Sequence, residues 1–213
     1  MYKNDNPNFV ILNKSTIFCF AMPFILWFLV AFFAEISAQS LNFDDKSFLE
    51  ERNHLNKRGM QVLLGWSALN LTTGIYGNFA FEGRSKYFHQ MNAAWNTVNL
   101  GLAVHGLLTL GQNDGSTIAE IMKSGQQFEK VLLFNAGLDV GYMAFGLYLR
   151  ERGKRQDDDR WYGYGNSMML QGAFLFAFDW VLFYLNVQQN KQLYEVLSSI
   201  SLGYGQMGVR LNF

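Results

Sequence analysis

The side chains best suited to chemistry lie in an uncharged stretch, residues 87–106, which reads YFHQMNAAWNTVNLGLAVHG. Four of its polar residues follow one another at steps of 3, 4 and 3: His89, Asn92, Asn96 and Asn99. This spacing places them on one face of a helix. Against lipid, each of these groups would lose its hydrogen-bond partners at a cost of a few kcal/mol. We therefore expect this face to point into a bundle of helices.

The other long apolar stretches supply polar groups that can meet this face: Trp66, Asn70, Asn135, Asp139, Gln171 and Asp179. Each helical residue adds about 1.5 Å along the axis, which sets the expected depth of these groups. Four of them lie about 12 Å inward from the expected outer ends of their helices: Asn70, Asn99, Asp139 and Asp179. The candidate ligand or proton site comprises this polar layer and its neighbours: Trp66, Asn70, His89, Asn92, Asn96, Asn99, Asp139, Gln171 and Asp179.

The two carboxylates of this layer support the sharpest chemical hypothesis. No Lys or Arg occurs in the apolar stretches to pair with Asp139 or Asp179. Two buried carboxylates at close range cannot both ionise cheaply, so we expect the pair to hold a proton. The same polar groups can instead serve only to pack the helices, because interhelical hydrogen bonds stabilise membrane bundles by about 0.6 kcal/mol on average. Binding and purely structural packing therefore both stay open.

The sequence offers few residues suited to catalysis or to metal binding. His89 and His105 are sixteen residues apart, which is about 24 Å along a helix, so they cannot share a metal ion. The chain contains neither HExxH nor CxxCH, the motifs of one class of zinc enzymes and of covalently attached haem. Ser67 has no histidine at its expected depth to act as a base. We therefore predict no catalytic residue, metal or cofactor, and an intramembrane enzyme is the least supported function.

Charge is distributed so unevenly that we expect four helices to cross a membrane. The 17 Lys and Arg balance the 17 Asp and Glu, which argues against a nucleic-acid surface. Four stretches are nearly free of charge and long enough to span a bilayer; the predicted spans are residues 59–81, 87–111, 131–149 and 164–187. Short connections favour an antiparallel, all-α four-helix bundle over residues 39–190. Small residues should let its helices approach closely: Gly74, Gly77, Ala136, Gly137, Gly141 and Gly146.

Residues 1–38 have the layout of a secretory signal peptide. Lysines precede an apolar run at residues 17–34, and small residues suited to cleavage follow it. An uncleaved anchor helix is the alternative. The only cysteine, Cys19, lies within this run, so cleavage would leave a mature chain without a thiol.

A signal peptide would place the start of the mature chain outside the cytoplasm and so set the orientation of every span. The loops at residues 82–86 and 150–160 then lie inside, and the cations of the second loop satisfy the positive-inside tendency. We expect a multi-pass protein of a bacterial inner membrane, with the mature N-terminus and the C-terminus extracytoplasmic. Anionic lipid head groups are the expected partners of the 150–160 loop.

Residues 191–213 form an amphipathic C-terminal tail in this prediction. Apolar residues at helical spacing indicate a short helix over residues 193–200, lying at the outer surface. From Gly203 the apolar residues alternate, which is typical of a strand. We expect this tail to pack as an interfacial cap on the mouth of the bundle.

Two segments carry a resemblance to a known family: YFHQMNAAWNTVNLGL at residues 87–102 and LQGAFLFAFD at residues 170–179. Over about residues 50–190, the chain resembles an uncharacterised family of small four-span bacterial membrane proteins, mainly from Bacteroidota. The resemblance implies a four-span bundle. It implies no activity and no functional residue.

Two functions of different kinds follow from these patterns. The first is a small helical bundle that binds a ligand, proton or ion at its buried polar layer. The alternative is a structural or partner-binding membrane subunit, in which the polar layer only holds the helices together. The expected surroundings are the lipid bilayer and either a second copy of the chain or another membrane protein. No nucleic-acid partner is expected.

Overall fold

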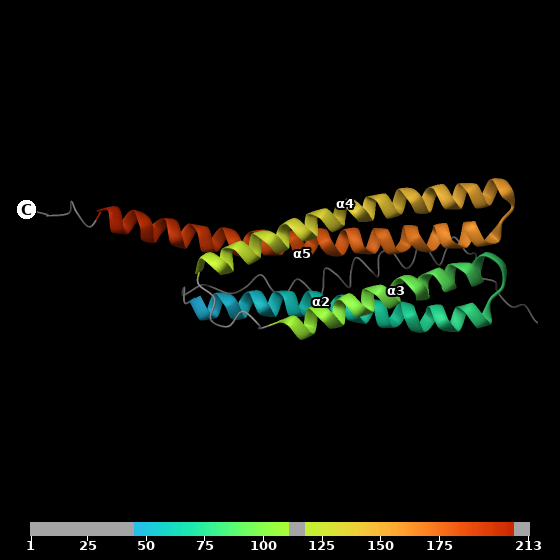
Figure 1. The fold of residues 1–213 in the computed structure, drawn as a ribbon, viewed down its shortest axis with the longest axis horizontal. Helices are drawn as coiled ribbons and strands as arrows, with labels where there is room; N and C mark the ends of the chain where they lie inside the picture. The colour runs from blue at the N-terminus through green and yellow to red at the C-terminus, as the bar shows by residue number, and fades with distance from the viewer. Residues whose placement is uncertain (1–44, 111–117, 207–213) are drawn as a thin grey trace, which may run out of the picture. The chain divides into compact units, whose positions relative to one another are not determined.

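The computed structural model describes residues 45–110 and 118–206 of the 213-residue chain. These residues form four helices (Figure 1): α2 (Asp45–Ala80), α3 (Gly83–Thr109), α4 (Ile118–Gln156) and α5 (Asp159–Gln206). The described part of the chain contains no strand. The predicted all-α fold with four helices is therefore confirmed.

Two helices begin well before the predicted spans. α2 begins at Asp45 rather than at residue 59, and α4 begins at Ile118 rather than at residue 131. The added segments are rich in Glu, Lys, Arg and Gln, which favour a helix about as well as leucine does. Counting only apolar residues therefore located the middle of each helix and missed its polar first turns.

The fourth helix also continues past its predicted end. α5 runs to Gln206 without a break, so residues 191–206 of the predicted tail belong to it. The separate short helix expected there is part of α5, and Gly203, where a strand was expected to begin, is helical. Residues 207–213 of the tail and the predicted signal or anchor at residues 1–38 lie outside the described residues.

Two helices contain a segment long and apolar enough to cross a membrane: Glu120–Gln156 in α4 and Asp159–Lys191 in α5. The sequence predicted four such spans, but α2 and α3 do not reach the same mean hydropathy. In α3 the asparagines lower that mean, although Asn92, Asn96 and Asn99 are all buried. Mean hydropathy averages all residues of a segment, so buried asparagines lower it as much as exposed ones do.

The two hairpin turns depend on residues with special backbone conformations or capping side chains. Gly83, at the start of α3, has a φ of 55°, a left-handed conformation that glycine adopts without steric cost. Asp158 caps the start of α5, because its carboxylate accepts hydrogen bonds from the backbone N–H groups of Arg160 (2.8 Å) and Trp161 (3.3 Å). Each turn thus ends one helix and starts the next within a few residues.

One arginine joins the two turns. Nε of Arg84 donates a hydrogen bond to the Asp159 carboxylate at 2.6 Å, and its Nη2 lies 3.3 Å from the Asp157 carboxylate. The hydrogen bond to Asp159 raises the pKa of the Arg84 guanidinium. The loops at residues 82–86 and 150–160 therefore lie at the same end of the bundle (Figure 1). We call this end the turn end.

Glycine sets how closely the helices approach. α2 packs on α3, α4 packs on α5, and α3 also packs on α5. A methyl group added at Gly74 or Gly77 would collide with α3, and one added at Gly146 would collide with α5, so these predicted contacts are confirmed. The prediction was wrong for Gly137 and Gly141: both lie on the exposed face of α4, and an added Cβ would meet nothing within 4 Å.

The interior of the bundle holds polar side chains beside apolar ones, and many large apolar side chains lie outside. Its buried polar residues come from all four helices: Arg52, Ser67, Asn70, Asn92, Asn96, Asn99, Asp139, Ser167, Gln171, Asp179, Asn186 and Asn190. Large apolar side chains are exposed on each helix, for example Phe79 (84%), Leu108 (73%), Phe134 (67%) and Trp180 (50%). Water-soluble bundles show the opposite arrangement, with apolar cores and charged or polar surfaces.

Candidate functional site

Four of the predicted site residues form one hydrogen-bonded group, which we call the amide network: Trp66, Asn70, Asn92 and Gln171. Nε1 of Trp66 donates to Oε1 of Gln171 at 2.9 Å, and Nε2 of Gln171 donates to Oδ1 of Asn92. Nδ2 of Asn92 in turn donates to Oδ1 of Asn70 at 3.0 Å and to its backbone carbonyl at 3.2 Å. The network joins α2, α3 and α5 through side chains that are mostly buried.

The indole that begins this network is held by stacking. The rings of Trp66 and Phe174 lie 3.8 Å apart between centroids and only 6° from parallel. Phe174 is buried on the face of α5 that also carries Gln171. The stack fixes the plane of the indole, and so directs its single N–H donor at the glutamine. Sequence reasoning included Trp66 and missed Phe174, since an aromatic residue among many in α5 gives no distinct signal.

Asn96 and Asn99 extend the polar face of α3 without joining another helix by a hydrogen bond. Nδ2 of Asn96 donates to the backbone carbonyl of Asn92 at 2.8 Å, within α3. Oδ1 of Asn96 and Nδ2 of Asn99 are buried and have no protein partner. Each is an open hydrogen-bonding position, because a buried amide atom normally finds a partner in protein or water.

The two predicted carboxylates meet, and we call them the carboxyl pair. Asp139 on α4 and Asp179 on α5 are 3% and 6% exposed, and their side chains lie close enough to interact with each other. Oδ2 of Asp139 has no partner. A hydrogen bond between two carboxyl groups requires a proton on one of them, since ionised carboxylates only accept. Two buried carboxyl groups at close range are suited to share one proton, because both cannot ionise cheaply.

No described Lys or Arg forms an ion pair with Asp139 or Asp179. Within the described ranges 45–110 and 118–206, the ion pairs are those of Arg84, which lies at the turn end. These ranges also hold no cluster of three His, Cys, Asp or Glu side chains that could bind a metal ion. The carboxyl pair is thus arranged to hold a proton or to hydrogen-bond a small guest.

His89 is placed apart from the other predicted site residues. Its ring lies against Gly77 and stacks near Phe81, with centroids 5.2 Å apart, toward the turn end. Its Nδ1 has no partner in the protein. The spacing argument assigned His89 to the face of α3 that points into the bundle, toward the end with the basic loops. The ring lies between α3 and α2, because glycine in α2 leaves space for it.

Two further buried amides were missed by the sequence reasoning. Asn186 and Asn190 are 1% and 5% exposed and lie on α5 beyond the carboxyl pair. Nδ2 of Asn186 donates to the backbone carbonyl of Leu182 at 2.8 Å, and Nδ2 of Asn190 donates to Glu129 at 2.5 Å. Their steps of four from Leu182 continue the buried face of α5. That signal was present in the sequence, but the predicted span ended at residue 187.

Basic and aromatic side chains gather at the turn end. Four guanidinium groups lie over aromatic rings, with distances to the ring centroids of 4.5 to 5.8 Å: Arg84 and Arg150 over Tyr162, Arg152 over Trp161, and Arg160 over Tyr164. Such stacking is favourable by about 0.5 to 1 kcal/mol at exposed sites. Aromatic rings and cations together are typical of helix ends at a membrane surface.

Comparison with known proteins identifies the family of this chain. No curated protein and no solved structure is significantly similar to the chain. One family model matches residues 62–180, which is more than half of the chain and includes all nine predicted site residues. The expectation of an uncharacterised family is thereby confirmed. The chain belongs to DUF6992, a family of unknown function.

Proposed function

We propose that the protein is a membrane-embedded four-helix bundle that binds a proton at the carboxyl pair. The observation that carries the proposal is that two buried carboxyl groups, those of Asp139 and Asp179, meet inside a bundle that exposes many large apolar side chains. A protonated pair of carboxyls suits a component of transport or sensing, because its proton can be released when a conformational change or a ligand separates the two groups.

The surface supports the membrane part of the proposal for all four helices. Lipid offers no hydrogen bonds, so a membrane bundle must pair its polar groups inside and present apolar groups outside. Phe79 on α2 and Leu108 on α3 are the most exposed large apolar side chains of the described residues. These two helices thus also present large apolar side chains outward, and the exposed hydroxyls of Thr72, Thr73 and Thr97 among them bond to carbonyls of their own helices.

We place the bundle in a bacterial inner membrane with the turn end in the cytoplasm. The loops at residues 82–86 and 150–160 lie together at that end and are rich in basic residues, in line with the positive-inside tendency for short loops. Other basic residues, such as Lys57 and Arg58, lie toward the opposite end. The mature N-terminus and the C-terminus are then extracytoplasmic. Anionic lipid head groups are the proposed partners of the 150–160 loop, where the guanidinium groups lie near aromatic rings.

Fractionation and fusion experiments test this location. The protein should stay with the membrane pellet after washing at alkaline pH and high salt, whereas a peripheral protein would be released. A cytoplasm-active reporter inserted after Arg155 should be active, and a periplasm-active reporter at the same position should be silent. Release into the supernatant would overturn the membrane proposal, and the reversed reporter pattern would overturn the orientation.

The bound proton can be detected by infrared spectroscopy of the purified protein. A protonated carboxyl gives a carbonyl-stretching band that an ionised carboxylate lacks. The wild type should show this band at neutral pH, and Asp139→Asn and Asp179→Asn should each remove it. Asp157→Asn is the matched control, because the Asp157 side chain is 96% exposed. Absence of the band from the wild type at neutral pH would overturn the proposal.

Stability as a function of pH provides an independent readout. The folded pair keeps a proton that the separated carboxyls give up in the unfolded chain, so the native state binds more protons near neutral pH. The free energy of unfolding should then fall as the pH rises, since stability decreases wherever the native state holds the extra proton. Asp139→Asn should flatten this dependence, because an amide keeps the hydrogen bond without a titrating proton.

A structural role is the second candidate, and the amide network favours it. The side chains of Trp66, Asn92 and Gln171 pair with polar atoms of neighbouring helices and need no guest. Under this alternative the protein is a structural or partner-binding subunit, associated with its own copies or with another membrane protein. Asp139→Asn and Asp179→Asn would then lower stability about as much as Asn99→Leu, with an unchanged dependence on pH.

A further inference from the structure

A cavity opens at the end of the bundle opposite to the turns, and we call it the end cavity. Its volume is about 260 Å³, many times the roughly 15 Å³ that a single water needs on this measure. Eleven residues of all four helices and of the chain just after α3 line it: Arg52, Asn53, Asn56, Met60, Gly106, Thr109, Leu110, Ser124, Gly125, Phe128 and Asn186. Polar and apolar side chains both line it, and the polar ones include a buried arginine.

Arg52 is the charged member of this lining, and it is 6% exposed. Its Nη1 donates to the backbone carbonyl of Ile121 at 2.7 Å, and its Nη2 donates to the Ser124 hydroxyl at 2.8 Å. A guanidinium has five N–H donors, so these two bonds leave three. Burial lowers the pKa of this guanidinium, which reflects the cost of holding its charge away from water.

No carboxylate compensates this charge within the described part of the chain, where the ion pairs involve only Arg84. A buried charge is normally paired, since isolation in a medium of low polarity costs several kcal/mol. The other polar residues of the lining are neutral. The end cavity thus combines a buried positive charge with hydrogen-bonding groups and space for a guest.

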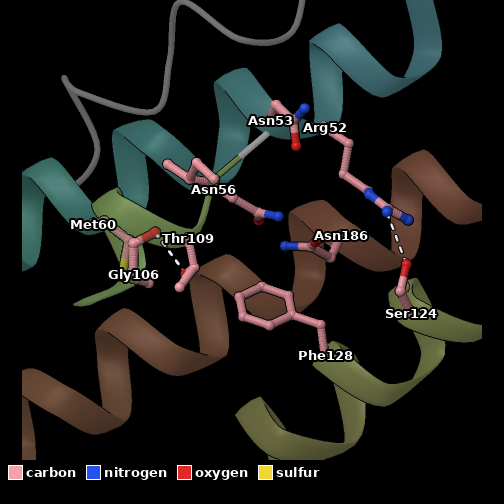
Figure 2. Close-up of a pocket in the computed structure, with 11 residues that line it drawn as sticks. Arg52, Asn53, Asn56, Met60, Gly106, Thr109, Ser124, Phe128 and Asn186 are labelled. Atoms are coloured by element: carbon pink, nitrogen blue, oxygen red, sulfur yellow. Dashed lines mark hydrogen bonds between the residues drawn. The ribbon is translucent and has the colours of Figure 1, made fainter. Parts of the chain in front are cut away.

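Asn56 and Asn186 direct further polar groups into the same space. Asn56 lies one helical turn after Arg52 on the same face of α2, and its Oδ1 is buried without a partner. Figure 2 shows the side chains of Arg52, Asn56 and Asn186 converging from α2 and α5, with the ring of Phe128 on the opposite side. A guest in this position would meet one guanidinium and two amides.

We propose that the end cavity binds a small oxyanion group, a phosphate or a carboxylate, through Arg52, Asn56 and Asn186. Guanidinium groups match the paired oxygens of these anions in both charge and geometry. Nδ2 of Asn186 has a second N–H beside the one that it gives to Leu182, and the Asn56 amide can turn to present its Nδ2 in place of the unpartnered Oδ1. The aromatic wall shields the ion pair from water. The oxyanion can be a free ion or part of a lipid head group, because both present the same negatively charged oxygens to Arg52. The proposal does not depend on the carboxyl pair, which lies deeper in the bundle.

Thermal unfolding of the full-length protein in detergent tests the proposal and separates the two sources. Inorganic phosphate should raise the unfolding temperature above that in sodium chloride of the same ionic strength, if the site takes free anions. Short-chain phosphatidylglycerol should do so, with inorganic phosphate inactive, if the site takes a lipid head group. A short-chain zwitterionic lipid with the same acyl chains controls for detergent effects. No specific shift with either probe would overturn the proposal.

Variants locate the binding to the end cavity. Arg52→Gln should weaken binding by about 10- to 100-fold, the loss expected for charged hydrogen bonds worth about 1.5 to 3 kcal/mol. Asn56→Asp keeps the shape of the side chain and supplies an internal carboxylate to Arg52, so it should abolish binding even if Arg52→Gln folds poorly. Arg155→Gln removes an exposed cation at the turn end and should bind like the wild type. Equal binding by Asn56→Asp and the wild type would overturn the assignment.

Discussion

Replacement of Asn92 by leucine removes the side chain that links three helices in the amide network. Asn92 accepts a hydrogen bond from Gln171 on α5 and donates to Asn70 on α2, and it is 2% exposed. Leucine fills a comparable volume but can form neither bond. Nε2 of Gln171 and Oδ1 of Asn70 then lose the partner that Asn92 provides, in a region that water does not reach.

The expected loss of stability follows from these contacts. Two interhelical pairings at the membrane average of about 0.6 kcal/mol each give about 1.2 kcal/mol. Stranded buried donors and acceptors cost about 1 kcal/mol or more apiece, which brings the total toward about 3 kcal/mol. We therefore expect Asn92→Leu to lower the free energy of unfolding by about 1 to 3 kcal/mol. The bundle should keep its helical content, because glycine contacts and apolar packing between the helices remain.

Equilibrium unfolding in mixed micelles, followed by circular dichroism, measures this loss. Thr97→Val is the matched control on α3: the Thr97 hydroxyl is exposed and bonds only to Ala93 of its own helix, so its loss should cost less than about 0.5 kcal/mol. Asn92→Leu and Gln171→Leu should also be coupled in a double-mutant cycle, since each removes the other's partner. Strictly additive effects of the two changes would refute the interpretation of the amide network as a cooperative unit.

Glycine substitutions test the helix contacts and the turn with paired controls. Gly146→Ala should destabilise the protein by about 1 to 3 kcal/mol, because the added methyl meets the backbone of α5. Gly141→Ala, on the open face of α4, should be neutral. Equal unfolding temperatures for the two variants would contradict the packing of α4 on α5. Gly83→Ala should cost about 1 to 2 kcal/mol, since its φ of 55° strains an L-residue. Gly101→Ala, in an open helical position, should be neutral or slightly stabilising, and a larger loss there than at Gly83 would contradict the assigned turn.

The number of helices could be read from the sequence because long uncharged stretches interrupt a chain that is otherwise rich in charge. Their ends could not, because charged residues favour helices as strongly as leucine does and so mark no boundary. α5 illustrates this point: its apolar part ends near residue 187, but the helix continues to Gln206. The two turns are set by single residues, Gly83 with its positive φ and Asp158 with its capping carboxylate.

The polar face of α3 could also be predicted, since a spacing of 3, 4 and 3 determines which residues share a face. Which residues meet on different helices depends on the relative position of the helices along the bundle axis. Counting residues along the sequence gives that position only to within about one helical turn. Asp139 and Asp179, which were assigned to one level, interact. Asn70, which was assigned to the same level as Asn99, bonds to Asn92 instead. The end cavity escaped prediction because Arg52 precedes the first apolar stretch.

The buried polar atoms are paired more completely at some levels of the bundle than at others. In the amide network nearly every side-chain group is paired across α2, α3 and α5, so that level gains nothing from a guest. At the carboxyl pair, Oδ2 of Asp139 is unpartnered, as is Nδ2 of Asn99 on α3. The interaction between the two carboxyls also joins α4 to α5. If the pair holds a proton, as we propose, loss of that proton would place two negative charges between these helices. We therefore expect protonation to be coupled to the packing of α4.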